Sequence, residues 1–69
     1  MKISARNVIE GTVRDVTKGS TTAHVRVEIG GGQVVTAAIT NEAVDDLGLQ
    51  VGKAVKVVVK SSDVMVAVD

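Results

Sequence analysis

The chain has no cysteine, proline, phenylalanine, tryptophan or tyrosine among its 69 residues. Without cysteine it can form neither a disulfide nor a thiolate metal site. Without aromatic side chains it cannot stack nucleic-acid bases, and its net charge of zero lacks the basic excess typical of nucleic-acid binders. No apolar run is long enough to cross a membrane, and residues 1–4 lack the apolar core of a signal peptide. We therefore expect one cytoplasmic domain, residues 1–69, with no nucleic-acid or membrane partner.

Valine is the most abundant residue, at 16 of 69 positions, whereas leucine occurs only twice. β-Branched side chains pack well on pleated surfaces, so this composition favours a mainly β fold. A domain this small buries only a modest fraction of its surface, and here no aromatic side chain enlarges the core. Small domains without disulfides or metals are commonly stabilised by oligomerisation, so the sequence predicts a homo-oligomer.

The first half of the chain predicts three strands. A long strand is expected over residues 7–18, where Gly11 indicates a bulge or a close backbone approach. After a turn at residues 18–20, apolar and polar residues alternate over residues 23–29, as in a half-buried strand. Three consecutive glycines, residues 30–32, then predict a tight turn into a return strand over residues 33–39.

The second half predicts a short helix and two more strands. The helix is expected at about residues 41–47, capped by Thr40 or Asn41 and stopped by Gly48. Strands follow at residues 54–59 and 64–68, with a polar break between them, and Met65 is expected to fill a gap in the core. The predicted architecture is a small, partly open barrel of about five strands, similar to the oligonucleotide/oligosaccharide-binding (OB) fold, with a simple sandwich as the alternative.

Two polar segments carry the ingredients of an anion site. The first consists of Ser4, Ala5, Arg6 and Asn7, just before the first long strand. The second, residues 60–63, begins with Lys60 and Ser61 and separates two apolar strands. Hydroxyls, backbone N–H groups and one or two cations can replace the water around an oxyanion. Each segment alone is better explained as an ordinary solvated connection, because turns commonly contain serine and lysine.

Other candidates are weaker. Thr40 lies at a helix start, where unpaired N–H groups favour anions, but by itself it is much better explained as a plain N-cap. The glycines at residues 30–32 lack the Lys-Ser/Thr sequence of a phosphate-binding loop. His24 is the only histidine, which excludes a multi-histidine metal-cation site within one chain, although several copies could form one about a symmetry axis. No nucleophile–base pair is recognisable, so we expect no enzyme.

Three segments together resemble a known family. The sequences of residues 1–7, 27–32 and 60–65 are similar to those of the molybdenum-pterin-binding proteins, or molbindins, whose repeat is the molybdate-type TOBE domain. The similarity covers essentially the whole chain in order, with Ser62 where threonine is common. It makes the solvated-loop explanation of the two polar segments much weaker.

The resemblance implies an OB-like barrel assembled as a hexamer, a trimer of dimers. It implies that molybdate or tungstate is bound reversibly at subunit interfaces, without an organic cofactor, for cytoplasmic molybdenum storage or homeostasis. The implied roles are a hydroxyl donor for Ser4 and mainly backbone N–H donors for Ala5, Arg6 and Asn7, with added charge from the Arg6 side chain. Lys60 would supply a cation or its N–H, and Ser61 a hydroxyl and its N–H. Thr40 is implied less securely, from a neighbouring subunit. The alternative is an OB-like regulatory or interaction module that binds nucleic acid or protein and stores no oxyanion.

Overall fold

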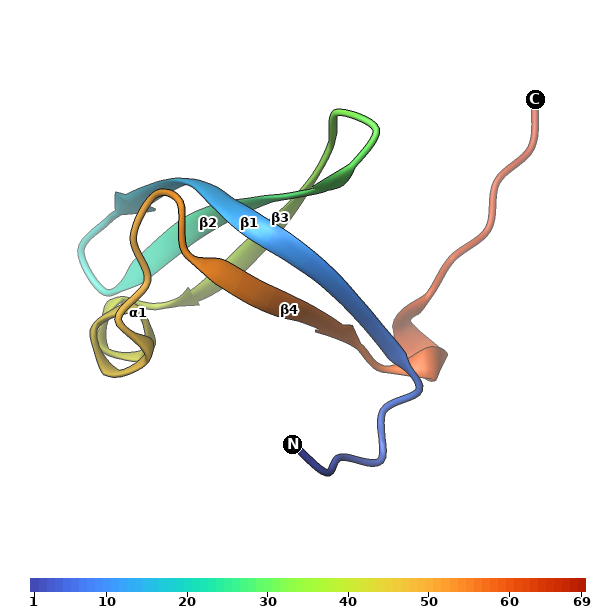
Figure 1. Ribbon diagram of the computed structural model, residues 1–69, viewed down its shortest axis with the longest axis horizontal. Coiled ribbons are helices and arrows are strands. Elements are labelled where there is room, and N and C mark those ends of the chain that lie inside the picture. The colour runs from blue at the N-terminus through green and yellow to red at the C-terminus, as the bar shows by residue number, and fades with distance from the viewer.

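A computed structural model describes the whole chain, residues 1–69. Four strands form a single antiparallel sheet in the order β3-β2-β1-β4, and one short helix follows β3 (Figure 1). The elements are β1 (Asn7–Lys18), β2 (Thr22–Gly30), β3 (Gln33–Thr40), α1 (Asn41–Leu47), β4 (Ala54–Val59) and the single 3-10 turn η1 (Ser61–Asp63). The expected mainly β fold with one short helix is confirmed.

The long strand β1 pairs with two neighbouring strands along different parts of its length. Its first half pairs with β4, from Asn7 opposite Val59 to Thr12 opposite Ala54. Its second half pairs with β2, and the register shifts between Val13 and Asp15. A bulge of this kind bends a strand and increases its twist, which lets the sheet curl around a common interior.

Gly11 lies where β1 passes close to β2. A Cβ atom at this position would lie 2.6 Å from Val27 Cγ1 and 2.7 Å from the carbonyl oxygen of Glu28. Both distances are below those of real Cβ contacts, so only glycine fits here without a shift of its neighbours. The close backbone approach expected for Gly11 is therefore confirmed, whereas the bulge lies a few residues further along β1.

Strand β2 carries most of the core. Ala23, Val25 and Val27 are buried, while the intervening polar side chains of β2 are exposed, as the alternation predicts. Gly31 and Gly32 have φ angles of 58° and 78°, which only glycine adopts readily, and they close the turn.

The helix is bounded by the residues expected from sequence. Thr40 caps it, because the Thr40 hydroxyl oxygen accepts a hydrogen bond of 3.0 Å from the Ala43 N–H. Gly48 ends it in the left-handed conformation, and Val44 is its one buried side chain. Lys53 Nζ donates a hydrogen bond of 2.6 Å to the carbonyl oxygen of Leu47, one of the carbonyl groups at the C-terminal end of α1 that have no partner within the helix. With seven residues, α1 is too short to cross a membrane, and no other helix of the structure meets the requirements for a span.

The prediction of a fifth strand over residues 64–68 is wrong for the single chain. This segment is extended but pairs with no strand, and Figure 1 shows it leading away from the sheet to the C-terminus. Met65 is 93% exposed and therefore does not fill the core. A strand needs a neighbour for its backbone N–H and C=O groups, and this chain offers none along that path. Only 5 of the 69 residues are buried.

Candidate functional site

The two polar segments singled out from sequence meet at one corner of the sheet. Asn7, the first residue of β1, pairs with Val59, the last residue of β4. Because the pairing is antiparallel, Arg6 just before Asn7 and Lys60 just after Val59 leave the sheet side by side. Figure 1 shows the segment before β1 and the turn η1 at this corner. The structure thus brings Ser4, Ala5, Arg6 and Asn7 together with Lys60 and Ser61.

The donors at this corner have few partners within the chain. The backbone N–H groups of Ala5, Arg6 and Lys60 donate no hydrogen bond, and neither do the side chains of Arg6 and Lys60. Neither cation forms an ion pair, although the chain contains two such pairs elsewhere. The Ser4 hydroxyl also has no partner in the chain. The corner therefore presents two cations and several free N–H and O–H donors.

Asn7 joins the two segments through its side chain. Asn7 Nδ2 donates a hydrogen bond of 3.2 Å to the carbonyl oxygen of Val59, across 52 residues of sequence. The side chain is half-buried, unlike the exposed side chains of Arg6 and Lys60. The family resemblance implied mainly a backbone role for Asn7, and nothing in the sequence indicates which carbonyl an asparagine at a strand start will meet.

Thr40 lies far from this corner within one chain. It pairs with Thr22 at the end of the β2–β3 ladder, which adjoins the last residues of β1 rather than the first. The whole length of β1 therefore separates Thr40 from Asn7. Figure 1 shows α1, which follows Thr40, at the opposite end of the sheet from η1.

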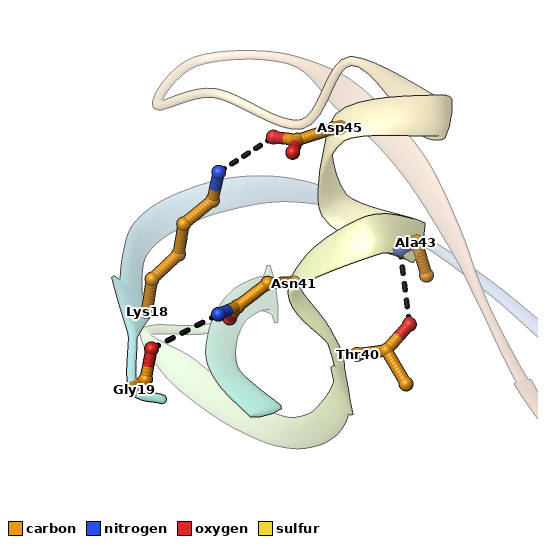
Figure 2. A network of polar contacts seen from close by, with 6 residues as sticks. All are labelled: Lys18, Gly19, Thr40, Asn41, Ala43 and Asp45. Atoms are coloured by element: carbon orange, nitrogen blue, oxygen red, sulfur yellow. Dashed lines mark hydrogen bonds and ion pairs between the residues drawn. The ribbon is translucent and has the colours of Figure 1, made fainter. Parts of the chain in front are cut away.

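The surroundings of Thr40 form a local polar network (Figure 2). Lys18 Nζ and Asp45 Oδ1 form an ion pair at 2.5 Å, so this cation is already neutralised. Asn41 Nδ2 donates a hydrogen bond of 2.9 Å to the carbonyl oxygen of Gly19 and fixes the β1–β2 turn against α1. The Thr40 hydroxyl accepts from Ala43, which leaves its own proton available to an acceptor outside the chain.

The chemistry of the Asn7 corner suits an anion rather than a cation. Its cationic side chains and free N–H groups are donors, and a tetrahedral oxyanion offers acceptors in several directions. Elsewhere, no group of three or more His, Asp or Glu side chains is placed to hold a metal ion. His24 is exposed on the outer face of β2, as its strand position predicts.

Comparisons with known proteins agree with these features. The TOBE domain family matches residues 3–66. The "Probable molybdenum-pterin-binding protein" of Haemophilus influenzae is 44% identical over 69 residues, 100% of both chains. Molybdenum-pterin-binding protein 3 of Clostridium pasteurianum is 47% identical over 66 residues, which is 96% of this chain and 97% of that protein.

Solved structures show the same fold. A molybdate-binding protein from Sporomusa ovata matches with a TM-score of 0.91 at 39% identity, covering 97% of this chain and 98% of that one. The cytoplasmic molybdate-binding protein ModG matches with a TM-score of 0.89 at 38% identity, covering 94% of this chain and 46% of that one. The chain is thus a TOBE domain with an OB-like fold. It belongs to the molybdenum-pterin-binding proteins.

Proposed function

We propose that this protein binds molybdate or tungstate reversibly, for storage or homeostasis of molybdenum in the cytoplasm. The observation that carries the proposal is the pairing of Asn7 with Val59, which gathers two cations and several unpartnered donors at one corner. The full-length similarity to molybdenum-pterin-binding proteins and to a cytoplasmic molybdate-binding protein supports this ligand and this compartment. These relatives are named for binding, and we propose no catalytic step and no organic cofactor.

In this proposal Arg6 and Lys60 supply positive charge to the dianion. Ser4 and Ser61 donate their hydroxyls, and Ala5, Arg6, Asn7 and Lys60 donate backbone N–H groups. Desolvation of a charged ligand is costly unless its oxygens find hydrogen bonds, so converging donors are needed. Sulfate has the same shape and charge but is smaller, and we expect a site sized for molybdate to reject it. Molybdate and tungstate are nearly equal in size and should bind similarly.

The proposed site is incomplete in one chain, because its donors lie exposed at an open corner. A second copy is therefore part of the proposal. The segment 64–68 is uncharged, and Met65, Val66 and Val68 are each at least 90% exposed. Such a segment is stable in water only when it pairs with a neighbour. It directly follows η1, so burial of this segment against a second copy would place the proposed site at a subunit interface.

A surface that can receive the segment exists on the same chain. A hollow lined mainly by apolar side chains, including Val35, Ile39 and Val57, is formed by residues of all four strands. The edge strand β3 has no charged residue, whereas lysines protect edge strands in many proteins. We propose that residues 64–68 of one chain cover this hollow in another. The hexamer implied by the family resemblance is the assembly we expect, with Thr40 reaching the anion from a neighbouring subunit.

Native mass spectrometry of the purified protein tests the ligand and the assembly together. The sample is measured alone, with molybdate and with sulfate as the matched control anion. A hexamer that gains several molybdate ions and no sulfate supports the proposal. A monomer, or a hexamer that ignores molybdate, contradicts it. Filter binding of single-stranded DNA at low salt tests the alternative module, and we expect no retention because the chain has no aromatic side chain.

A further inference from the structure

We propose that the Asn7 carboxamide is a positioning group of the oxyanion site, in addition to any donation by its backbone. This inference rests on the proposed function. Its starting point is that the two halves of the site come from residues 4–7 and 60–61, which the fold joins only through the end of the β1–β4 ladder. Beyond Asn7 and Val59 no backbone hydrogen bond links the two segments.

The hydrogen bond from Asn7 Nδ2 to the Val59 carbonyl, at 3.2 Å, is the single side-chain hydrogen bond between these two parts of the chain. Of the seven side-chain hydrogen bonds in the structure, the other six lie elsewhere. The half-buried Asn7 side chain therefore ties the N-terminal half of the site to the Lys60 half.

The atom that accepts this hydrogen bond explains how the Asn7 side chain can affect ligand binding. The Val59 carbonyl and the Lys60 N–H belong to one planar peptide group, in which they point in opposite directions. A hydrogen bond that holds the Val59 oxygen toward β1 therefore turns the Lys60 N–H away from β1, toward the open edge of β4. That N–H donates no hydrogen bond within the chain. The Asn7 side chain thus reinforces the ladder pairing that directs a free backbone donor outward, where a ligand between subunits would lie.

Loss of the carboxamide should leave the sheet intact, because the β1–β4 ladder has six residue pairs from Asn7 to Thr12. The Val59–Lys60 peptide would then be held toward β1 by the last pair of the ladder alone, and the direction of the Lys60 N–H would be less firmly fixed. Fixed donors bind an anion better than mobile ones because no ordering cost is incurred on binding. We expect molybdate affinity to fall by about 5- to 10-fold, the size of one neutral hydrogen bond.

The test uses Asn7→Leu, which keeps the branching and the number of side-chain heavy atoms and removes the donor. Lys53→Met is the matched control, since it removes side-chain hydrogen bonds to the backbone carbonyls of Leu47 and Gly48 on the far side of the molecule. Calorimetric titration with molybdate gives the affinity, thermal unfolding gives the stability, and an amide NMR spectrum follows the Lys60 N–H signal. Asn7→Ser, whose shorter side chain does not reach Val59, replaces the first variant if that variant fails to fold.

We expect the Asn7 variant to bind molybdate about 5- to 10-fold more weakly, with a smaller molybdate-induced shift of the Lys60 amide signal, while Lys53→Met binds like the wild type. Wild-type affinity in the Asn7 variant overturns the positioning role. In that case weakened binding by Ser4→Ala and Lys60→Ala leaves the proposed function standing. Wild-type affinity in all three variants overturns the site as a whole.

Discussion

Gly11 of β1 and Val27 of β2 lie so close that a Cβ on Gly11 would come within 2.6 Å of Val27 Cγ1. The same Cβ would meet the Glu28 carbonyl oxygen, which is backbone and moves less easily than a side chain. We therefore expect Gly11→Ala to lower the free energy of unfolding by about 1–3 kcal/mol, the usual cost of overpacking. Denaturant unfolding at fixed protein concentration measures it, with Thr12→Ala as an exposed neighbouring control. Equal stability of the two variants would contradict this prediction and would show that β2 shifts to accommodate the methyl group at little cost.

Ser4→Ala and Lys60→Ala should each weaken molybdate binding without unfolding the protein. Both side chains are exposed and make no hydrogen bond within the chain, so the fold does not depend on them. A hydrogen bond to a charged group is worth about 1.5–3 kcal/mol, which corresponds to a loss of about 10- to 100-fold in affinity. Calorimetric titration measures the affinity, and Ser20→Ala and Lys56→Ala are controls of the same residue types away from the corner. Unchanged affinity in both site variants would count decisively against this site.

Val66→Asp should dissociate the protein into smaller species. Val66 is 90% exposed in the single chain, so a carboxylate there would leave an isolated chain undisturbed. Buried against a second copy, the same carboxylate would be desolvated without a partner, which is strongly unfavourable. Sedimentation or native mass spectrometry reads out the change, and Val51→Asp, at a turn where the valine is 69% exposed, is the control. An unchanged assembly in both variants would mean that residues 64–68 lie outside the interface.

Thr40 offers a test that separates two roles of one hydroxyl. Thr40→Val removes the cap bond to Ala43 and should lower the free energy of unfolding by about 1 kcal/mol, whereas Thr40→Ser keeps the hydroxyl and should change little. If Thr40 also donates to an anion bound by a neighbouring subunit, Thr40→Val will weaken molybdate binding as well. Parallel unfolding and titration curves measure both effects. A loss of stability with full affinity would restrict Thr40 to the cap.

Much of the fold was predictable because its signals are local. The alternation over residues 23–29, the threonine before the helix and the glycine that ends it act within a few residues of themselves. The fifth strand was not predictable in the same way. Residues 64–68 have the composition of a strand, but a strand also needs a neighbour, and the single chain supplies none. The prediction that Met65 fills a gap in the core was wrong for the same reason.

The candidate site, too, was predictable only in part from the sequence. The residue types of its two segments indicate anion chemistry, and the family resemblance joined them into one site. The separation of the two segments in sequence does not indicate how far apart they lie in space. The pairing of Asn7 with Val59 shows that they lie at the same corner of the sheet. Thr40, chosen by its helix start, lies at the other end of β1, so it can serve the site only from another copy.

The sequence by itself determined the mainly β character, the turns, the capped helix and the donor chemistry, because these follow from side-chain shape and from contacts between near neighbours. Only the tertiary structure decided which backbone N–H groups remain free, which carbonyl Asn7 holds and which apolar segment lacks a partner. Those properties depend on strand register and on the curl of the sheet. Both are fixed by contacts between residues far apart in the chain, which no local pattern records.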